Sequence, residues 1–116
     1  MDIKNEDYSI SYDVQATTIR CEGSLRLSGM EEYASLVGLF NQVASLDPPP
    51  ALIILDLRHL EFLNSSGINV VSKFVIKVRQ RQEIKMLVKG ANRIAWQGKS
   101  LKNLQRLMPN LQLEWE

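Results

Sequence analysis

The sequence predicts an α/β fold in which helices pack on a mixed β-sheet of four to five strands, in the order β-β-α-β-α-β-α-β. The chain has 116 residues, of which 45% are hydrophobic and 23% are charged, as in an ordinary soluble domain. Short strand-like runs alternate with longer segments of helical periodicity. Strands that are separated by helices are expected to be parallel. Residues 1–116 should therefore form a single domain.

Two strands are predicted near the N-terminus. Residues 8–14 alternate between apolar and polar side chains, which is typical of a half-buried strand. Residues 17–27 are rich in strand-forming side chains and are interrupted by Gly23, which indicates a bulge or bend. Residues 13–16 would form the hairpin turn between them, although this turn lacks the usual glycine.

The first helix is predicted to begin at a capping box made by Ser28 and Glu31. It should end near Ser45, because the prolines at 48–50 cannot continue a helix. Its apolar stripe contains Tyr33, Leu36, Val37, Phe40, Val43 and Ala44.

The centre of the chain is predicted to be a strand followed by the longest helix. Residues 52–57 form a short apolar run, typical of a strand that is buried on both faces. The helix should run from Ser66 to about Arg81 and bury Ile68, Val71, Phe74, Val75 and Val78. A strand at 84–88, a short helix at 101–108 and a final strand at 111–115 complete the predicted elements.

Composition excludes several classes of protein. No apolar run approaches the roughly 20 residues of a membrane span. The acidic, polar N-terminus is not a signal peptide. The single cysteine, Cys21, cannot form an internal disulfide, which favours the cytoplasm.

Charge is unevenly distributed along the chain. Residues 1–61 contain ten acidic and four basic residues, whereas residues 62–113 contain ten basic residues and only Glu83. The basic part could contact an acidic partner or a nucleic acid. Solvated helix faces explain it more simply, so nucleic-acid binding is not expected. Four of its lysines are expected to be solvent-exposed, namely Lys73, Lys77, Lys99 and Lys102.

Residues 56–67 carry the most informative motif, Asp-Leu-Arg-His-Leu-Glu-Phe-Leu-Asn-Ser-Ser-Gly. This motif resembles the signature of STAS domains, the fold shared by sulphate-transporter tails and anti-sigma factor antagonists. The order of elements also fits, so the resemblance covers nearly the whole chain. It implies a STAS-like, non-enzymatic domain that binds an anti-sigma factor, a Ser/Thr kinase or another signalling protein. In the antagonists a partner kinase phosphorylates the serine that follows the motif aspartate, and that position is Ser65.

The chain departs from the antagonist pattern at two places. Asn64 stands where the motif has aspartate. Ser24 and Arg26 stand where the antagonists usually have glutamate and aspartate. The resemblance therefore implies a partner surface with altered electrostatics. The residues expected to bind the partner are Arg58, Asn64, Ser66, Gly67, Asn69, Ser72, Lys73, Ser24 and Arg26.

Two functions of this motif remain open from the sequence. In the first, phosphorylation of Ser65 adds negative charge and releases the partner. In the second, the domain is an adaptor that has lost the switch. Ser66 is expected to be a structural neighbour and a possible helix cap.

No catalytic or cofactor site is predicted. Asp56 lies at the end of a strand, but only His59 and Glu61 are near it in sequence, and a capping role is more common for such a residue. The single cysteine and the single histidine form no metal signature. Gly98-Lys99-Ser100 resembles the end of a phosphate-binding loop. The position that must be glycine in such a loop, five residues before Gly98, is occupied by Arg93.

Overall fold

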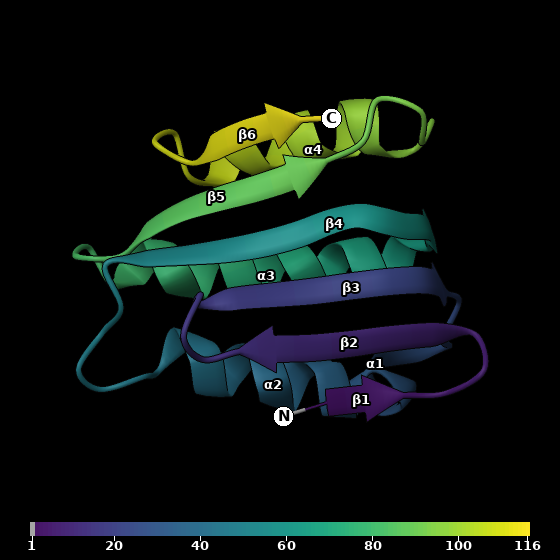
Figure 1. Ribbon diagram of the computed structural model, residues 1–116, viewed down its shortest axis with the longest axis horizontal. Coiled ribbons are helices and arrows are strands. Elements are labelled where there is room, and N and C mark those ends of the chain that lie inside the picture. Colours follow the sequence, from purple (N-terminus) through teal and green to yellow (C-terminus); the bar gives the residue numbers. More distant parts are fainter. Residues whose placement is uncertain (1) are drawn as a thin grey trace.

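The computed structural model describes residues 2–116, which form a six-stranded sheet with helices on one face (Figure 1). The strands are β1 (Asp2–Lys4), β2 (Tyr8–Asp13), β3 (Thr18–Leu25), β4 (Leu52–Leu63), β5 (Lys85–Gly90) and β6 (Gln112–Trp115). They lie side by side in chain order. The first three strands are antiparallel, and β3, β4, β5 and β6 are parallel. The predicted fold class, a mixed sheet with helices packed on it, is confirmed.

The strand count exceeds the predicted four to five. The additional strand is β1, where a single apolar residue, Ile3, lies between two charged ones, so no periodicity reveals it. The central strand β4 is also longer than expected, because it pairs with β3 as far as Leu63. The segment after Asp56 is therefore strand and not loop.

One face of β4 is left uncovered by the helices. Ile53, Leu55 and Leu57 are fully buried, whereas Leu52 is 37% exposed and Ile54 is half-buried. The prediction that this strand is buried on both faces was wrong. All helices within residues 2–116 lie behind the sheet in Figure 1, so the opposite face is open.

The hairpin between β2 and β3 uses an aspartate in place of the usual glycine. The Oδ1 atom of Asp13 accepts hydrogen bonds from the backbone N–H groups of Gln15 and Ala16, at 3.0 and 3.2 Å. The predicted irregularity at Gly23 is also present, with a register shift in β3 and a φ of 92°. A side chain at Gly23 would overlap with the carbonyl oxygen of Asp7.

The helices are α1 (Gly29–Glu32), α2 (Ala34–Ala44), α3 (Ser65–Gln80) and α4 (Gln97–Leu107). The predicted first helix is thus divided at Tyr33. The expected capping box is absent, since the Ser28 side chain makes no capping hydrogen bond. Instead, the Ser28 backbone N–H donates to Glu32 Oε1 at 2.9 Å, so the acid that reaches back is Glu32 and not Glu31.

None of the described helices is long and apolar enough to cross a membrane.

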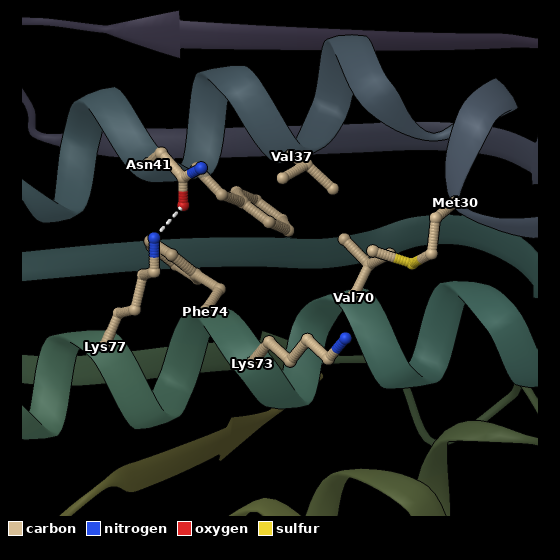
Figure 2. Close-up of a pocket in the computed structure, with 8 residues that line it drawn as sticks. Met30, Val37, Asn41, Val70, Lys73, Phe74 and Lys77 are labelled. Carbon is tan, nitrogen blue, oxygen red and sulfur yellow. Dashed lines mark hydrogen bonds between the residues drawn. The ribbon is translucent and has the colours of Figure 1, made fainter.

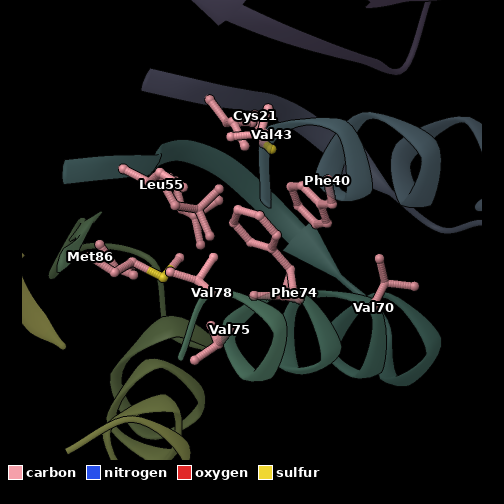
Figure 3. Close-up of a cluster of buried hydrophobic side chains, with 14 of the residues drawn as sticks. Cys21, Phe40, Val43, Leu55, Val70, Phe74, Val75, Val78 and Met86 are labelled. Atoms are coloured by element: carbon pink, nitrogen blue, oxygen red, sulfur yellow. The ribbon is translucent and has the colours of Figure 1, made fainter. Parts of the chain in front are cut away.

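The hydrophobic core lies between the sheet and the α2–α3 layer (Figure 3). Phe40 of α2 and Phe74 of α3 stack with ring centroids 4.3 Å apart. On α3 the buried residues include Val70, whereas Ile68, which the sequence predicts as buried, is only half-buried. Full burial of one such side chain contributes about 1.5–3 kcal/mol to the free energy of unfolding, so this layer fixes the orientation of α3.

Within residues 93–99, which show no periodicity, two side chains donate hydrogen bonds to carbonyl groups of β4 beyond the part of β4 that pairs with β5. Gln97 is fully buried, and its Nε2 donates to the carbonyl oxygens of Leu57 and Leu60, at 2.6 and 3.2 Å. Its Oε1 accepts from the Ala91 N–H at 2.7 Å. Trp96 Nε1 donates to the Leu60 carbonyl at 3.1 Å. The helix α4 begins at Gln97, earlier than predicted. Gln97 is a polar residue that is buried through hydrogen bonds to backbone groups, so no apolar periodicity marks this part of the helix.

Candidate protein-binding site

The start of α3 is held by the side chain of Asn64. This residue is the N-cap, in extended conformation, and its Oδ1 accepts from the Gly67 N–H at 2.9 Å. The same oxygen accepts from the Tyr33 hydroxyl at 2.7 Å. Its Nδ2 donates to the Leu27 carbonyl at 2.7 Å. One amide side chain thereby joins α3, the β3–α1 connection and the segment between α1 and α2.

These contacts explain the departure from the aspartate of the STAS motif. The Leu27 carbonyl requires a donor, and an ionised carboxylate has none. Burial raises the pKa of Tyr33, so its hydroxyl stays protonated and is a permanent donor to Asn64. The cap is Asn64, and the expectation that Ser66 caps the helix was wrong.

Ser65, Ser66 and Gly67 form the first turn of α3. Ser65 is exposed, Ser66 is half-buried and Gly67 is buried. A side chain at Gly67 would overlap with Leu63 and with the Tyr33 hydroxyl. Gly67 therefore lets the helix approach β4 closely, and it presents no side chain of its own to a partner.

Ser24 and Arg26 lie at the same end of the sheet as Ser65. In β3, Ser24 pairs with Phe62, and the Asn64 N–H donates to the Leu25 carbonyl at 3.3 Å. The Arg26 guanidinium lies over the Phe62 ring, 4.7 Å from its centroid, in a cation–π contact. Arg26 is exposed and Ser24 is half-buried. The structure thus brings both positions to the region where α3 begins.

Asn69, Ser72 and Lys73 continue this region along α3. Asn69 and Lys73 are exposed, and Ser72 is half-buried. Together with the residues above they define what we call the helix-start surface. Its members are Ser24, Arg26, Asn64, Ser65, Ser66, Asn69, Ser72 and Lys73.

Arg58 lies apart from the helix-start surface, on the open face of the sheet. Its guanidinium binds Asp56 at 2.8 Å and Glu116 at 2.9 Å, and Arg20 approaches Asp56 at 3.4 Å. Asp56 is 1% exposed. Burial alone would raise its pKa, but the hydrogen bonds and charge of Arg58, with the charge of Arg20, hold the pKa below its usual value. The Asp56 carboxylate also accepts from the Arg58 backbone N–H at 3.1 Å, a local hydrogen bond within β4 and not a cap at its end.

Cys21, Glu61 and His59 are the remaining reactive or ionisable side chains that the sequence places near β4 or its motif. Burial, with the nearby charges of Asp56 and Glu22, raises the pKa of the Cys21 thiol to about 12, so it is protonated and not nucleophilic. Glu61 pairs with Arg93 at 2.9 Å, and His59 is exposed. Within residues 2–116 no group of three or more His, Cys, Asp or Glu side chains could hold a metal ion.

A groove between α2 and α3 is the feature that sequence reasoning missed (Figure 2). Its volume is about 150 Å³. The residues that line it are Met30, Val37, Phe40, Asn41, Val70, Lys73, Phe74 and Lys77. Because Lys73 belongs to both, the groove adjoins the helix-start surface. Two features of the sequence could have indicated it, namely the absence of charged residues from 34–44 and the position of Met30 just before that segment.

The fold and the site together define a class: an α/β domain of the arrangement that the STAS resemblance implies, with a capped, partly exposed helix start. No protein-family model and no curated protein matches the sequence. Solved structures from Pseudomonas aeruginosa share the fold. A chain in the crystal structure of the diguanylate cyclase SiaD in complex with its activator SiaC matches with a TM-score of 0.72 and 14% identity, over 100% of this chain and 99% of that chain.

Two structures of SiaC itself are also similar. One matches with a TM-score of 0.65 and 13% identity, over 99% of this chain and 95% of that chain. Apo-SiaC matches with a TM-score of 0.69 and 12% identity, over 100% and 98%. At these identities the likeness establishes the fold and nothing further.

Proposed function

We propose that this chain is a non-catalytic STAS-like adaptor that binds a signalling protein through the helix-start surface. The observation that carries the proposal is the end-to-end likeness to SiaC, a protein described as the activator of a diguanylate cyclase. A diguanylate cyclase is accordingly the first class of partner to test. The chain would act by binding, since the buried polar side chains within residues 2–116, Asp56 and Gln97, are engaged in structural contacts.

The geometry supports this role because the surface is fixed before any partner arrives. Asn64 holds the first turn of α3 through three hydrogen bonds of 2.7 to 2.9 Å. The core layer behind it fixes the rest of the helix. A preorganised surface loses little conformational entropy on association. Ser65, Asn69 and Lys73 are exposed on it and available for polar contacts.

Phosphorylation of Ser65 is the second candidate, and it adds a switch to the same surface. The specific observation in its favour is that Ser65 is exposed at the first position of α3, where negative charge is favourable. A phosphate would add nearly two negative charges to a surface whose charged members are Arg26 and Lys73, and would oppose a partner that had docked on the unphosphorylated surface. A Ser/Thr kinase would then be one partner, and an anti-sigma factor remains a candidate for the other.

Affinity purification with matched variants tests the proposal. The tagged chain is purified from its native lysate, and captured proteins and phosphosites are identified by mass spectrometry. Asn69→Glu and Ser65→Asp should each weaken capture at least tenfold, about 1.4 kcal/mol. Lys102→Glu on α4 changes charge away from this surface and should capture normally. Equal capture by all four proteins would refute the helix-start surface. Weakened capture with no phosphate on Ser65 in cells would leave the adaptor without the switch.

A further inference from the structure

The α2–α3 groove has the shape of a receptor for one apolar side chain. Its floor is the stacked pair of Phe40 and Phe74, with the rings inclined by 15°. Val37 on α2 faces Val70 on α3 across it (Figure 2). A groove of about 150 Å³, in which five of the eight lining residues are apolar, has the volume for a group of roughly benzene size. The groove can therefore receive one large apolar side chain.

Both ends of the groove are defined by side chains. Lys77 donates to Asn41 Oδ1 at 2.6 Å and joins the two helices at one end. Met30, which is 46% exposed, lies over Val70 at the other end (Figure 2). An exposed methionine beside an apolar groove is typical of an adaptable binding surface.

The outer side of α2 beside the groove is unusual for a surface helix. Its eleven residues, 34–44, include no charged residue. Ala34 and Gly38 are exposed on it. Glycine lowers helix stability relative to alanine, and no atom lies within 4 Å of the position that a Gly38 Cβ would take. Packing within the chain thus does not require a glycine at position 38. A glycine there would allow the backbone of another molecule to approach α2 closely.

The charges around the groove select the partner. Lys73 and Lys77 are exposed on its α3 side, and none of the described lining residues is acidic. Glu31 and Glu32 follow Met30 at the opposite end. A partner with acidic residues beside its apolar anchor would be attracted to the lysines, provided that these acids lie away from α1.

We propose that the groove binds an acidic amphipathic helix of a protein partner, with one large apolar side chain inserted between α2 and α3. The backbone of this helix would lie against Ala34 and Gly38, and its acidic residues would pair with Lys73 and Lys77. This inference rests on the proposed function, because it names the chemistry of the partner that reaches the helix-start surface.

Selection from a library of helix-forming peptides, displayed against the full chain, tests the groove directly. The selected peptides should be enriched in Asp and Glu around one Leu, Ile, Met or Phe. Their affinity should fall at least tenfold for the double variant Lys73→Glu/Lys77→Glu and for Gly38→Gln. The matched control is Lys99→Glu/Lys102→Glu, which makes the same charge change on α4 and should bind normally. Circular dichroism establishes that each variant is folded.

Several results would overturn the inference. These are selected peptides that are basic or uncharged, binding that is insensitive to both groove variants, and a selection without enriched sequences. Self-association that Gly38→Gln abolishes would identify a second copy of the chain as the occupant and would equally overturn it. The protein captured in the purification experiment should also discriminate against the groove variants. If it binds them normally while Asn69→Glu weakens capture, the groove inference fails and the proposed function stands.

Discussion

Two polar clusters at β4 differ in whether they position an exposed residue that a partner could contact. On the open face of the sheet, Asp56 is buried beneath Arg58 and Arg20, and its charge is neutralised inside the chain. At the end of the same strand, Asn64 is uncharged and its hydrogen bonds are also internal, but the residue it positions, Ser65, is exposed. The first cluster uses its polar groups to stabilise the sheet. The second uses them to present a surface.

The clusters should therefore respond in opposite ways to substitution and to acid. The ionic cluster depends on charge that is present at neutral pH. The amide cluster depends on a donor and an acceptor that do not titrate.

Removing the partner of the buried carboxylate should cause the largest loss. Arg58→Met leaves Asp56 buried with only the more distant Arg20, and should lower the free energy of unfolding by about 3 kcal/mol at neutral pH. Denaturant unfolding followed by circular dichroism measures the change. Arg93→Met, which breaks the exposed pair with Glu61, is the matched control and should change stability little. Stability equal to that of the parent would show that Arg58 does not compensate the buried charge.

The pH dependence of the parent protein follows from the same pair. The pKa of Asp56 is lowered in the folded chain, so its contribution is fully present above the unfolded value of about 3.9. That contribution should be lost as the pH falls through the lower, folded pKa. In Arg58→Met, where burial without the pairing favours the protonated form, the acid-induced loss from this site should disappear. Unfolding measured from neutral pH down to about pH 2 separates the two proteins.

The sequence predicted the fold well where hydrophobic periodicity is strong and poorly where polar groups act over long range. The strand at Leu52 and the helix at Ser65 are visible because burial imposes a pattern on their residues. β1 is too short and polar for this. The role of Gln97 depends on carbonyl groups of residues 57 and 60, about forty positions earlier in the chain. A pattern of neighbouring residues in the sequence cannot predict a contact over this separation.

The candidate site shows the same limit. The helix predicted from Ser66 begins one residue earlier, at Ser65, and the departure at Asn64 was visible from the sequence. Its reason was not, because it depends on the Leu27 carbonyl and the Tyr33 hydroxyl, which only the folded chain brings together. The α2–α3 groove likewise arises from two helices whose apolar stripes each resemble ordinary core.

Restoring the motif aspartate should damage the amide cluster. In Asn64→Asp a carboxylate oxygen replaces the Nδ2 that lies 2.7 Å from the Leu27 carbonyl, and the lost hydrogen bond should cost about 1–2 kcal/mol at neutral pH, since aspartate still caps the helix. Repulsion from that carbonyl should raise the folded pKa of the new carboxyl group. The deficit relative to the parent should then shrink as the pH falls below that pKa, because the protonated acid can donate to Leu27. A deficit that is constant from pH 4 to pH 7 would contradict this account.

The smallest effect on stability is expected at the serine that the amide cluster presents. Asn64 supplies the cap and Ser65 is exposed, so Ser65→Asp removes no described contact of the fold. Negative charge at the first turn interacts favourably with the helix dipole, so the variant should gain about 0.3–1 kcal/mol. Ser66→Ala, the matched control, should change stability by less than about 0.5 kcal/mol because Ser66 is not the cap. A loss of more than about 2 kcal/mol for Ser65→Asp would assign the Ser65 hydroxyl a structural role. Weakened capture by that variant could then be due to altered folding, whereas a stable variant attributes the weakening to charge on the helix-start surface.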